Sequence, residues 1–153
     1  MFSMDNFTPE VRSRIMSHIK GKDTKPEELV RRGLFALGFR FRKNDRRYPG
    51  HPDIVLPKYR TIIFVNGCFW HHHENCEFAT EPKTNEEFWS GKFSRNRERD
   101  AENARKLNEM GFRVIVVWEC ALKEKERLPS ILLALSDEIE KGRSPYVEFP
   151  PPL

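Results

Sequence analysis

A short stretch between residues 65 and 76 carries the side chains best suited to binding a metal ion. Cys68, His73 and Cys76 follow the spacing C-x4-H-x2-C, and the third cysteine of the chain, Cys120, comes just after an apolar run. Three thiolates and one imidazole form a closed tetrahedral site of the structural zinc type, with no position left for water. We therefore predict one structural zinc ion, with three unrelated cysteines in an aromatic-rich core as the alternative. Only the fold can bring Cys120 near the other three.

His71 stands beside these residues and is left over from the proposed ligand set. Because imidazole titrates near neutral pH, this side chain could act as a general base. The alternative is a spare member of the histidine run, either solvated or bonded to a backbone carbonyl. The residues alone leave both interpretations open.

Two carboxylates could serve a site for a hard cation such as Mg²⁺. Asp53 follows a proline and opens the apolar run 54–56, an arrangement that resembles the nucleases with a PD-(D/E)-x-K pattern. The next strand ends in Val65-Asn66-Gly67, with neither the acid nor the lysine of that pattern. A turn or a cap is the other explanation for Asp53. Glu27 is explained equally well as half of a capping box with Thr24.

Large aromatic and basic side chains could contact nucleic acid. Phe69, Trp70 and Trp89 could insert between base pairs, because aromatic wedges offset the cost of unstacking with new contacts. The alternative is that these rings belong to the core, where tryptophan usually lies in a small domain. Three arginines lie in a polar segment further along: Arg95, Arg97 and Arg99. They could hold phosphates, or they could form a solvated face of arginine–glutamate pairs.

The helices and strands that must position these groups follow from hydrophobic periodicity. We predict an N-terminal helical arm that buries little, and a helix that begins after Thr24 and ends at Gly38. A long polar helix capped by Ser94 and a final amphipathic helix come later. Short apolar runs predict four strands. The expected elements are helices over 8–19, 24–37, 94–110 and 131–142, and strands over 39–42, 53–56, 61–65 and 114–118.

This order of elements limits the topology. The early strands are close enough in sequence to form an antiparallel meander, and the long helix before 114–118 allows a crossover to a parallel strand. We expect an α/β domain in which a mixed β-sheet is flanked by helices on both faces. The arm covers about residues 1–22. The residues from about 144 to 153 end in Phe-Pro-Pro-Pro-Leu and are expected to form a flexible tail.

Length and composition narrow the class of protein. The chain has 153 residues, which fits a single domain over 1–153 with its own core. Hydrophobic residues make up 38%, and no apolar run approaches the roughly 20 residues that a membrane-spanning helix needs. The excess of Lys and Arg over Asp and Glu, 27 against 23, is compatible with a polyanionic partner. Three cysteines without an N-terminal apolar segment favour a reducing compartment over a disulfide framework.

Four motifs together resemble the very short patch repair (Vsr) endonucleases. They are RSRIMSHIKGKDTKPE, PGHPDIV, IIFVNGCFWHHH and VIVVWECAL, spread from about Arg12 to Leu122. The resemblance implies a restriction-endonuclease-like core with a structural zinc site. It also implies an Mg²⁺-dependent enzyme that nicks double-stranded DNA on the 5′ side of the T in a T·G mismatch. Such mismatches arise when 5-methylcytosine deaminates to thymine.

The resemblance further implies roles for individual residues. The catalytic set would be Asp53 as the Mg²⁺ ligand together with the backbone carbonyl of Val65, His71 as the catalytic histidine, and Glu27 as a support for water at the metal. The zinc ligands would be Cys68, His73, Cys76 and Cys120. The residues that approach DNA would be Met16, Ile19, Phe69, Trp70 and Trp89. Asn66 departs from the family, which often has a His or an acid there, because Asn can hydrogen-bond but cannot carry a proton.

A mismatch endonuclease is the leading hypothesis for the function. The alternatives are a restriction-type endonuclease that cuts intact duplex and a zinc-stabilised module that binds distorted DNA without cleavage. The family further implies the bacterial cytoplasm or nucleoid, a functional link to a DNA cytosine-5 methyltransferase, and a monomer that does not contact membranes. Whether a MutL-type mismatch-repair protein acts with it stays open.

Overall fold

A five-stranded mixed sheet forms the centre of the computed structural model, which describes residues 8–18, 25–80 and 82–151. The spatial order of the strands is their chain order: β1 (Arg42–Lys43), β2 (Ile54–Leu56), β3 (Thr61–Asn66), β4 (Arg113–Trp118) and β5 (Tyr146–Phe149). The first three strands pair antiparallel, whereas β3 with β4 and β4 with β5 pair parallel. The antiparallel meander and the parallel crossover that the sequence predicts are therefore confirmed.

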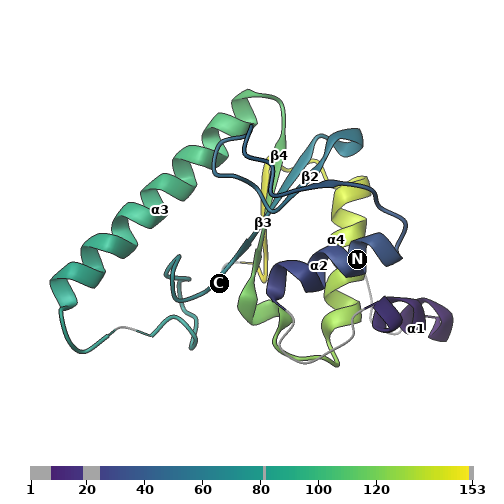
Figure 1. The fold of residues 1–153 in the computed structure, drawn as a ribbon, viewed down its shortest axis with the longest axis horizontal. Coiled ribbons are helices and arrows are strands. Elements are labelled where there is room, and N and C mark those ends of the chain that lie inside the picture. Colours follow the sequence, from purple (N-terminus) through teal and green to yellow (C-terminus); the bar gives the residue numbers. More distant parts are fainter. Residues whose placement is uncertain (1–7, 19–24, 81, 152–153) are drawn as a thin grey trace.

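Helices cover both faces of this sheet (Figure 1). They are α1 (Pro9–His18), α2 (Pro26–Ala36), α3 (Glu86–Glu109) and α4 (Leu128–Lys141), with short 3-10 turns η2 (Pro57–Tyr59) and η3 (Glu119–Leu122). In Figure 1 the long helix α3 lies on one side of the sheet, and α1, α2 and α4 lie on the other. The expected α/β class with flanking helices is confirmed. Among the described residues, no helix combines the length and the apolar character needed to cross a membrane.

The strands β3 and β4 separate two hydrophobic clusters. Side chains alternate between the two faces of a strand. Ile63 and Ile115 accordingly pack with α1, α2 and α4, whereas Ile62 and Val114 pack under α3. Burial on both faces explains why 114–118 is a continuous apolar run without alternation.

The N-terminal helices differ from the sequence prediction in two respects. Ile15 of α1 is fully buried in the core, so this helix buries more than its few apolar residues indicate. The expected capping box is wrong, because the N-cap of α2 is Lys25 without a side-chain bond, and Thr24 lies outside the described residues. Pro26 in the first turn, whose fixed φ suits a helix start, replaces the cap. Gly38 ends the helix as predicted, with a φ of 99°.

Several elements begin or end elsewhere than predicted, and α4 begins at Leu128 and not at residue 131. Helix α3 begins at Glu86 and not at Ser94, because its first turns carry aromatic side chains that pack against the preceding loop. The strand expected over 39–42 is reduced to Arg42–Lys43, since Phe39 turns into the core. The expected flexible tail contains a strand, β5, whose Val147 and Phe149 pack on the core.

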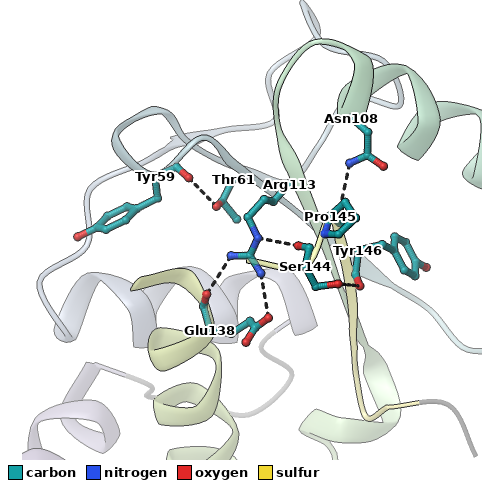
Figure 2. Close-up of polar contacts among 8 residues, drawn as sticks. All are labelled: Tyr59, Thr61, Asn108, Arg113, Glu138, Ser144, Pro145 and Tyr146. Atoms are coloured by element: carbon teal, nitrogen blue, oxygen red, sulfur yellow. Dashed lines mark hydrogen bonds and ion pairs between the residues drawn. The ribbon is translucent and has the colours of Figure 1, made fainter. Parts of the chain in front are cut away.

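Arg113 joins the start of β5 to the rest of the fold (Figure 2). Its guanidinium donates to the Ser144 carbonyl at 2.7 Å, to the Glu138 carbonyl at 2.9 Å and to Glu138 Oε1 at 2.8 Å. Asn108 of α3 donates its side-chain amide to the Pro145 carbonyl at 3.0 Å. One strand, two helices and the segment before β5 are thus tied together by polar contacts.

We expect Arg113→Met to lower the free energy of unfolding by about 2 kcal/mol, because the change leaves the partly buried Glu138 carboxylate without its guanidinium partner and removes the side-chain donor of the Ser144 carbonyl. Arg127→Met is the matched control. Arg127 pairs with Glu124 in an ion pair that is two-thirds exposed on both sides, so its loss should cost less than about 0.5 kcal/mol. Urea unfolding of the two variants measures the difference, and equal effects would contradict the anchoring role of Arg113.

Candidate functional site

One cavity of about 750 Å³ gathers most of the residues that the sequence marks as catalytic. Asp53 lies just before β2, Val65 and Asn66 end β3, and His71 lies in the following loop; all four line the cavity. Because β2 and β3 pair antiparallel, the entry of one strand lies beside the exit of the other. The sheet therefore brings these groups together from separate segments of the chain.

Asp53 lies against the backbone of β3. The N–H of Val65 donates to Oδ2 of Asp53 at 2.7 Å. The pKa of Asp53 is raised, chiefly by burial, although this N–H bond acts in the opposite direction and the Glu27 carboxylate adds to the rise. A carboxylate buried beside a second acid is stabilised by a bound cation, which offsets the cost of burying its charge. The site therefore fits an oxygen-ligated divalent cation.

His71 has a partner that the sequence did not identify. Its Nδ1 lies 2.5 Å from Oδ2 of Asp100, which projects from α3. Both side chains are about two-thirds buried, with 27% and 33% exposed. A carboxylate on Nδ1 fixes the orientation of an imidazole ring. Asp100 sits in a run of alternating charges, RNRERDAEN, where nothing in the spacing distinguishes it from a solvated residue.

The remaining predicted catalytic residues take different positions. Asn66 is 8% exposed and lines the cavity beside Val65. Glu27 lies in the first turn of α2, close enough for its charge to raise the pKa of Asp53, but it does not line the cavity. Glu27 therefore lies at the edge of the site and affects it through its charge.

The four predicted metal ligands converge. Donor atoms of Cys68, His73, Cys76 and Cys120 all lie within 4.8 Å of one another. Cys68 follows β3 and Cys120 follows β4, and parallel strands end at the same edge of a sheet, which is why two distant cysteines meet. The backbone N–H of Cys120 donates to Sγ of Cys68 at 3.4 Å. This group could hold a metal ion, as predicted.

The chemistry of these donors also fits a metal ion. Burial raises the pKa of the Cys68 thiol to about 12 and raises that of Cys120, while it lowers the pKa of His73. Buried thiols at that edge of the sheet remain protonated unless a cation replaces their protons. A set of three sulfurs and one imidazole nitrogen is that of a closed structural site.

Tight turns shape the loop that carries these residues. The N–H of His71 donates to the Gly67 carbonyl at 3.2 Å, and that of His73 donates to the Cys68 carbonyl at 2.9 Å. His72 and Asn75 adopt left-handed conformations, with φ of 48° and 55°. The loop is therefore folded back on itself, and His71 and His73 point to different sites although they are two residues apart.

The predicted wedge residues form one aromatic cluster with helix α3. Phe69 contacts Trp70, Trp89 and Phe93 with ring centroids 5.1, 5.6 and 5.4 Å away. Phe93 is only 2% exposed, whereas Trp70 is 53% exposed. Lys92 places its ammonium 5.2 Å from the Trp70 ring centre. We call Phe69, Trp70, Trp89 and Phe93 the aromatic cluster. Phe93 is its buried end, and Trp70 is its exposed end, beside the positive charge of Lys92.

The other residues predicted to contact DNA do not form one surface. Arg95 and Arg99 lie one helical turn apart on α3, but Arg97 faces elsewhere, lines the cavity and lies 3.7 Å from Glu74. Met16 is half-buried on α1. Ile19 lies outside the described residues.

The last strand contributes two side chains that the sequence did not predict. Tyr146 and Glu148 of β5 line the same cavity as Asp53 and His71. Partial burial and then the carboxylates of Glu148 and Asp100 raise the pKa of Tyr146. The segment read as a tail therefore forms one wall of the site.

Comparison with known proteins gives a consistent result. Residues 4–77 match the family model described as DNA mismatch endonuclease Vsr. The chain is 50% identical over 139 residues to the type II nicking enzyme V.NmeAIP of Neisseria meningitidis serogroup A, covering 88% of this chain and 99% of that protein. It is 42% identical over 130 residues to the DNA mismatch endonuclease Vsr of Escherichia coli, covering 85% of this chain and 81% of that protein.

We expect the purified protein to carry one tightly bound metal ion per chain, and Cys68→Ser to lose that ion. Because such an ion contributes directly to folding, the melting temperature of the variant should fall by about 10 °C or more. His73→Ala should behave in the same way. His71→Ala is the matched control and should keep the ion. Metal analysis with thermal unfolding tests this; a metal-free parent, or loss of metal from His71→Ala but not from His73→Ala, would overturn the assignment.

Proposed function

This chain belongs to the DNA mismatch endonuclease Vsr family, and we propose that it nicks double-stranded DNA on the 5′ side of the T in a T·G mismatch. As a member of the family it is an endonuclease, a hydrolase of phosphodiester bonds. The observation that carries the proposal is the convergence of Asp53 and the His71–Asp100 pair in one cavity. Hydrolysis of a phosphodiester needs a base for water and charge stabilisation at phosphorus; His71 would supply the base, and a cation held by Asp53 would supply the charge stabilisation.

His71 is the base in this proposal. Because Asp100 accepts a hydrogen bond from Nδ1, the ring presents Nε2 as its basic nitrogen. Nε2 takes a proton from the attacking water, and Asp100 stabilises the imidazolium that forms. The bond between phosphorus and the 3′ oxygen then breaks, and the leaving 3′ oxygen takes a proton from solvent water, which leaves a 3′ hydroxyl and a 5′ phosphate.

Asp53 and the backbone carbonyl of Val65 would hold Mg²⁺. When bound, this ion would neutralise negative charge on the phosphoryl oxygens. Glu27 adds negative charge at the edge of the site, which favours a cation there and orients water near it. Asn66 lines the cavity beside Val65 and can hydrogen-bond water without exchanging a proton with it.

Cys68, His73, Cys76 and Cys120 would hold Zn²⁺ as an architectural ion. All four coordination positions would be filled by protein, so the ion would have no open position for substrate. Its role would be to fix the loop that carries both His71 and the aromatic cluster. The catalytic and recognition residues would then share one rigid support.

The aromatic cluster would read the mismatch. A T·G pair opens at lower cost than a matched pair, so the exposed Trp70 and its neighbour Phe69 could wedge into the duplex there. Trp89 lies beside Phe69 and would support them. Lys92, Arg95 and Arg99 on α3 would meet phosphates, and the N-terminal arm with Met16 and Ile19 would approach the same duplex.

The proposed setting follows from the reaction. The substrate arises from deaminated 5-methylcytosine, so the enzyme would work alongside a DNA cytosine-5 methyltransferase in the bacterial cytoplasm, as a monomer. A MutL-type protein could join later repair. Two alternative functions are a restriction-type nuclease and a DNA-binding module without cleavage. The following experiment distinguishes both from a mismatch endonuclease.

We expect the protein to nick one strand of a duplex with a T·G pair only when Mg²⁺ is present, and to leave the matched T·A duplex intact. Asp53→Asn should abolish nicking but retain DNA binding, because it removes the metal ligand and keeps an oxygen that can accept the Val65 N–H. Gel analysis of end-labelled strands measures both. Cleavage of both strands of T·A duplex would instead indicate a restriction-type enzyme, and binding without any scission a DNA-binding module.

Asp53→Asn should also change the stability of the protein in a pH-dependent way. Burial raises the pKa of Asp53 in the folded protein above its value in the unfolded chain. The protonated side chain therefore favours folding fully at a pH below the unfolded pKa, and this contribution is lost as the pH rises through the folded pKa. Without Mg²⁺ at pH 7, Asp53→Asn should therefore melt at a higher temperature than the parent, and the gap should close towards pH 4. Added Mg²⁺ should stabilise the parent alone. A variant less stable than the parent at pH 7 would show that the charge of Asp53 supports the fold.

We expect Trp70→Ala to weaken binding to T·G duplex by about tenfold, since stacking on a base is worth about 1–3 kcal/mol. Binding to T·A duplex should change less, because it depends on phosphate contacts. Phe35→Ala is the matched control, an aromatic residue of similar exposure (49%) on α2. Titrations at one salt concentration test this; equal losses on both duplexes would show that Trp70 does not discriminate.

A further inference from the structure

Strand β5 has two different faces. It pairs parallel with β4, with Tyr146 opposite Val114 and Glu148 opposite Val116. Val147 and Phe149 point to the cluster that packs on α4, and side chains alternate along a strand. Tyr146 and Glu148 therefore point to the other face, where they line the cavity with Asp53 and His71. The chain thus returns to the catalytic cavity at its C-terminal end.

Glu148 makes a specific contact in that cavity. Its Oε1 accepts a hydrogen bond from Nε1–H of Trp118 at 2.6 Å. Trp118 is the last residue of β4 and is only 7% exposed. A buried indole N–H needs an acceptor, and an ionised carboxylate is a strong one. The contact therefore fixes the plane of the indole ring.

The Trp118 ring touches the loop that carries the site. It stacks on the imidazole of His73, with ring centres 4.0 Å apart and planes 7° apart. It also meets the ring of His71 edge-on, at 6.3 Å and 75°. One indole is thus in contact with a metal-site residue and with the base, so its plane affects where both rings can lie.

Glu148 is itself held in place. The residues before β5 are bound by Arg113, which donates to Ser144, and by Asn108, which donates to Pro145 (Figure 2). These donors come from β4 and from α3, the helix that also carries Asp100. The position of the Glu148 carboxylate is therefore set by rigid elements and not by a free chain end.

We propose that Glu148 is a positioning residue for strand scission, which acts through Trp118 to hold the ring of His71 in line with Asp100 and the attacking water. This inference rests on the proposed function, in which His71 is the base. Glu148 does not touch the reacting atoms. It sets the indole plane, and the indole limits the motion of the His71–His73 loop.

The test compares Glu148→Ala with Glu148→Gln in the full-length, metal-loaded protein. Glutamine keeps an oxygen that can accept the indole N–H, and alanine does not. We expect Glu148→Ala to slow single-turnover nicking of T·G duplex by about tenfold or more, as for the loss of groups that orient catalytic ligands, with unchanged DNA affinity and metal content. Glu148→Gln should keep most of the rate. Glu140→Ala, an exposed acid on α4, is the control and should match the parent.

Trp118→Phe tests the same contact from the side of the indole. It removes the N–H and keeps a ring, so it should slow nicking as Glu148→Ala does, and the double variant should be no slower than either single variant. Equal losses in Glu148→Ala and Glu148→Gln, a parent-like rate in Glu148→Ala, or additive losses in the double variant would overturn the proposal. If Glu148→Ala fails to fold, the rates of Glu148→Gln and Trp118→Phe still decide.

A readout that does not need cleavage separates this inference from the proposed function. In ¹⁵N-labelled protein, the indole N–H resonance of Trp118 should shift strongly in Glu148→Ala and little in Glu148→Gln, with the His71 ring resonances moving in the former only. A parent that does not nick T·G duplex would refute the proposed function alone. An unchanged indole resonance in Glu148→Ala would refute the role of Glu148, whatever the parent cleaves.

Discussion

The convergence of three cysteines and one histidine at the edge of the sheet is the constraint on which the rest of the site depends. The loop after β3 contains His71 and the first two rings of the aromatic cluster, and nothing in its composition would give it a regular structure. Cys68 and Cys76 flank the part of the loop that carries His71, and a bound metal ion would link them to Cys120, which the parallel pairing of β3 and β4 brings to the same edge. With that ion the loop would take its position from β3 and β4, two strands that are largely buried.

The remaining elements complete the site around that loop. The antiparallel turn from β2 to β3 sets Asp53 against Val65, and α3 carries Asp100 to His71 while its first turns hold the aromatic cluster. Helix α3 thus links the part of the molecule proposed to read the mismatch with the part proposed to cleave. Strand β5 closes the cavity from the other side, with Glu148 bound to Trp118. In this proposal one loop and one helix serve both scission and recognition, which is how a small fold would support the two together.

The sequence predicted what depends on local pattern. The apolar runs predicted the strands β2, β3 and β4, and the C-x4-H-x2-C spacing predicted three of the four donors that converge in a group able to hold a metal ion. It missed individual residues whose roles depend on contacts between distant segments. Asp100 looks like any residue of a charged helix until α3 lies beside the loop, and Glu148 lies in a proline-rich end that forms a strand only because β4 offers a parallel edge. The start of α3 was misplaced for a related reason, since Ser94 is a good cap in isolation but Phe88, Trp89 and Phe93 gain more from packing as a helical face.

Hydrogen exchange at the backbone amides of the loop would test most directly whether the metal site holds the catalytic loop in place. The amides of His71 and His73, which donate to Gly67 and Cys68, should exchange slowly in the metal-loaded protein. After chelation, with metal loss verified by analysis, they should exchange at least about tenfold faster, while the amides of Ile63 and Ile115 in the sheet remain protected. Loop amides that stay equally protected in the metal-free protein would contradict the account, because the loop would then owe its structure to packing and not to the four converging ligands.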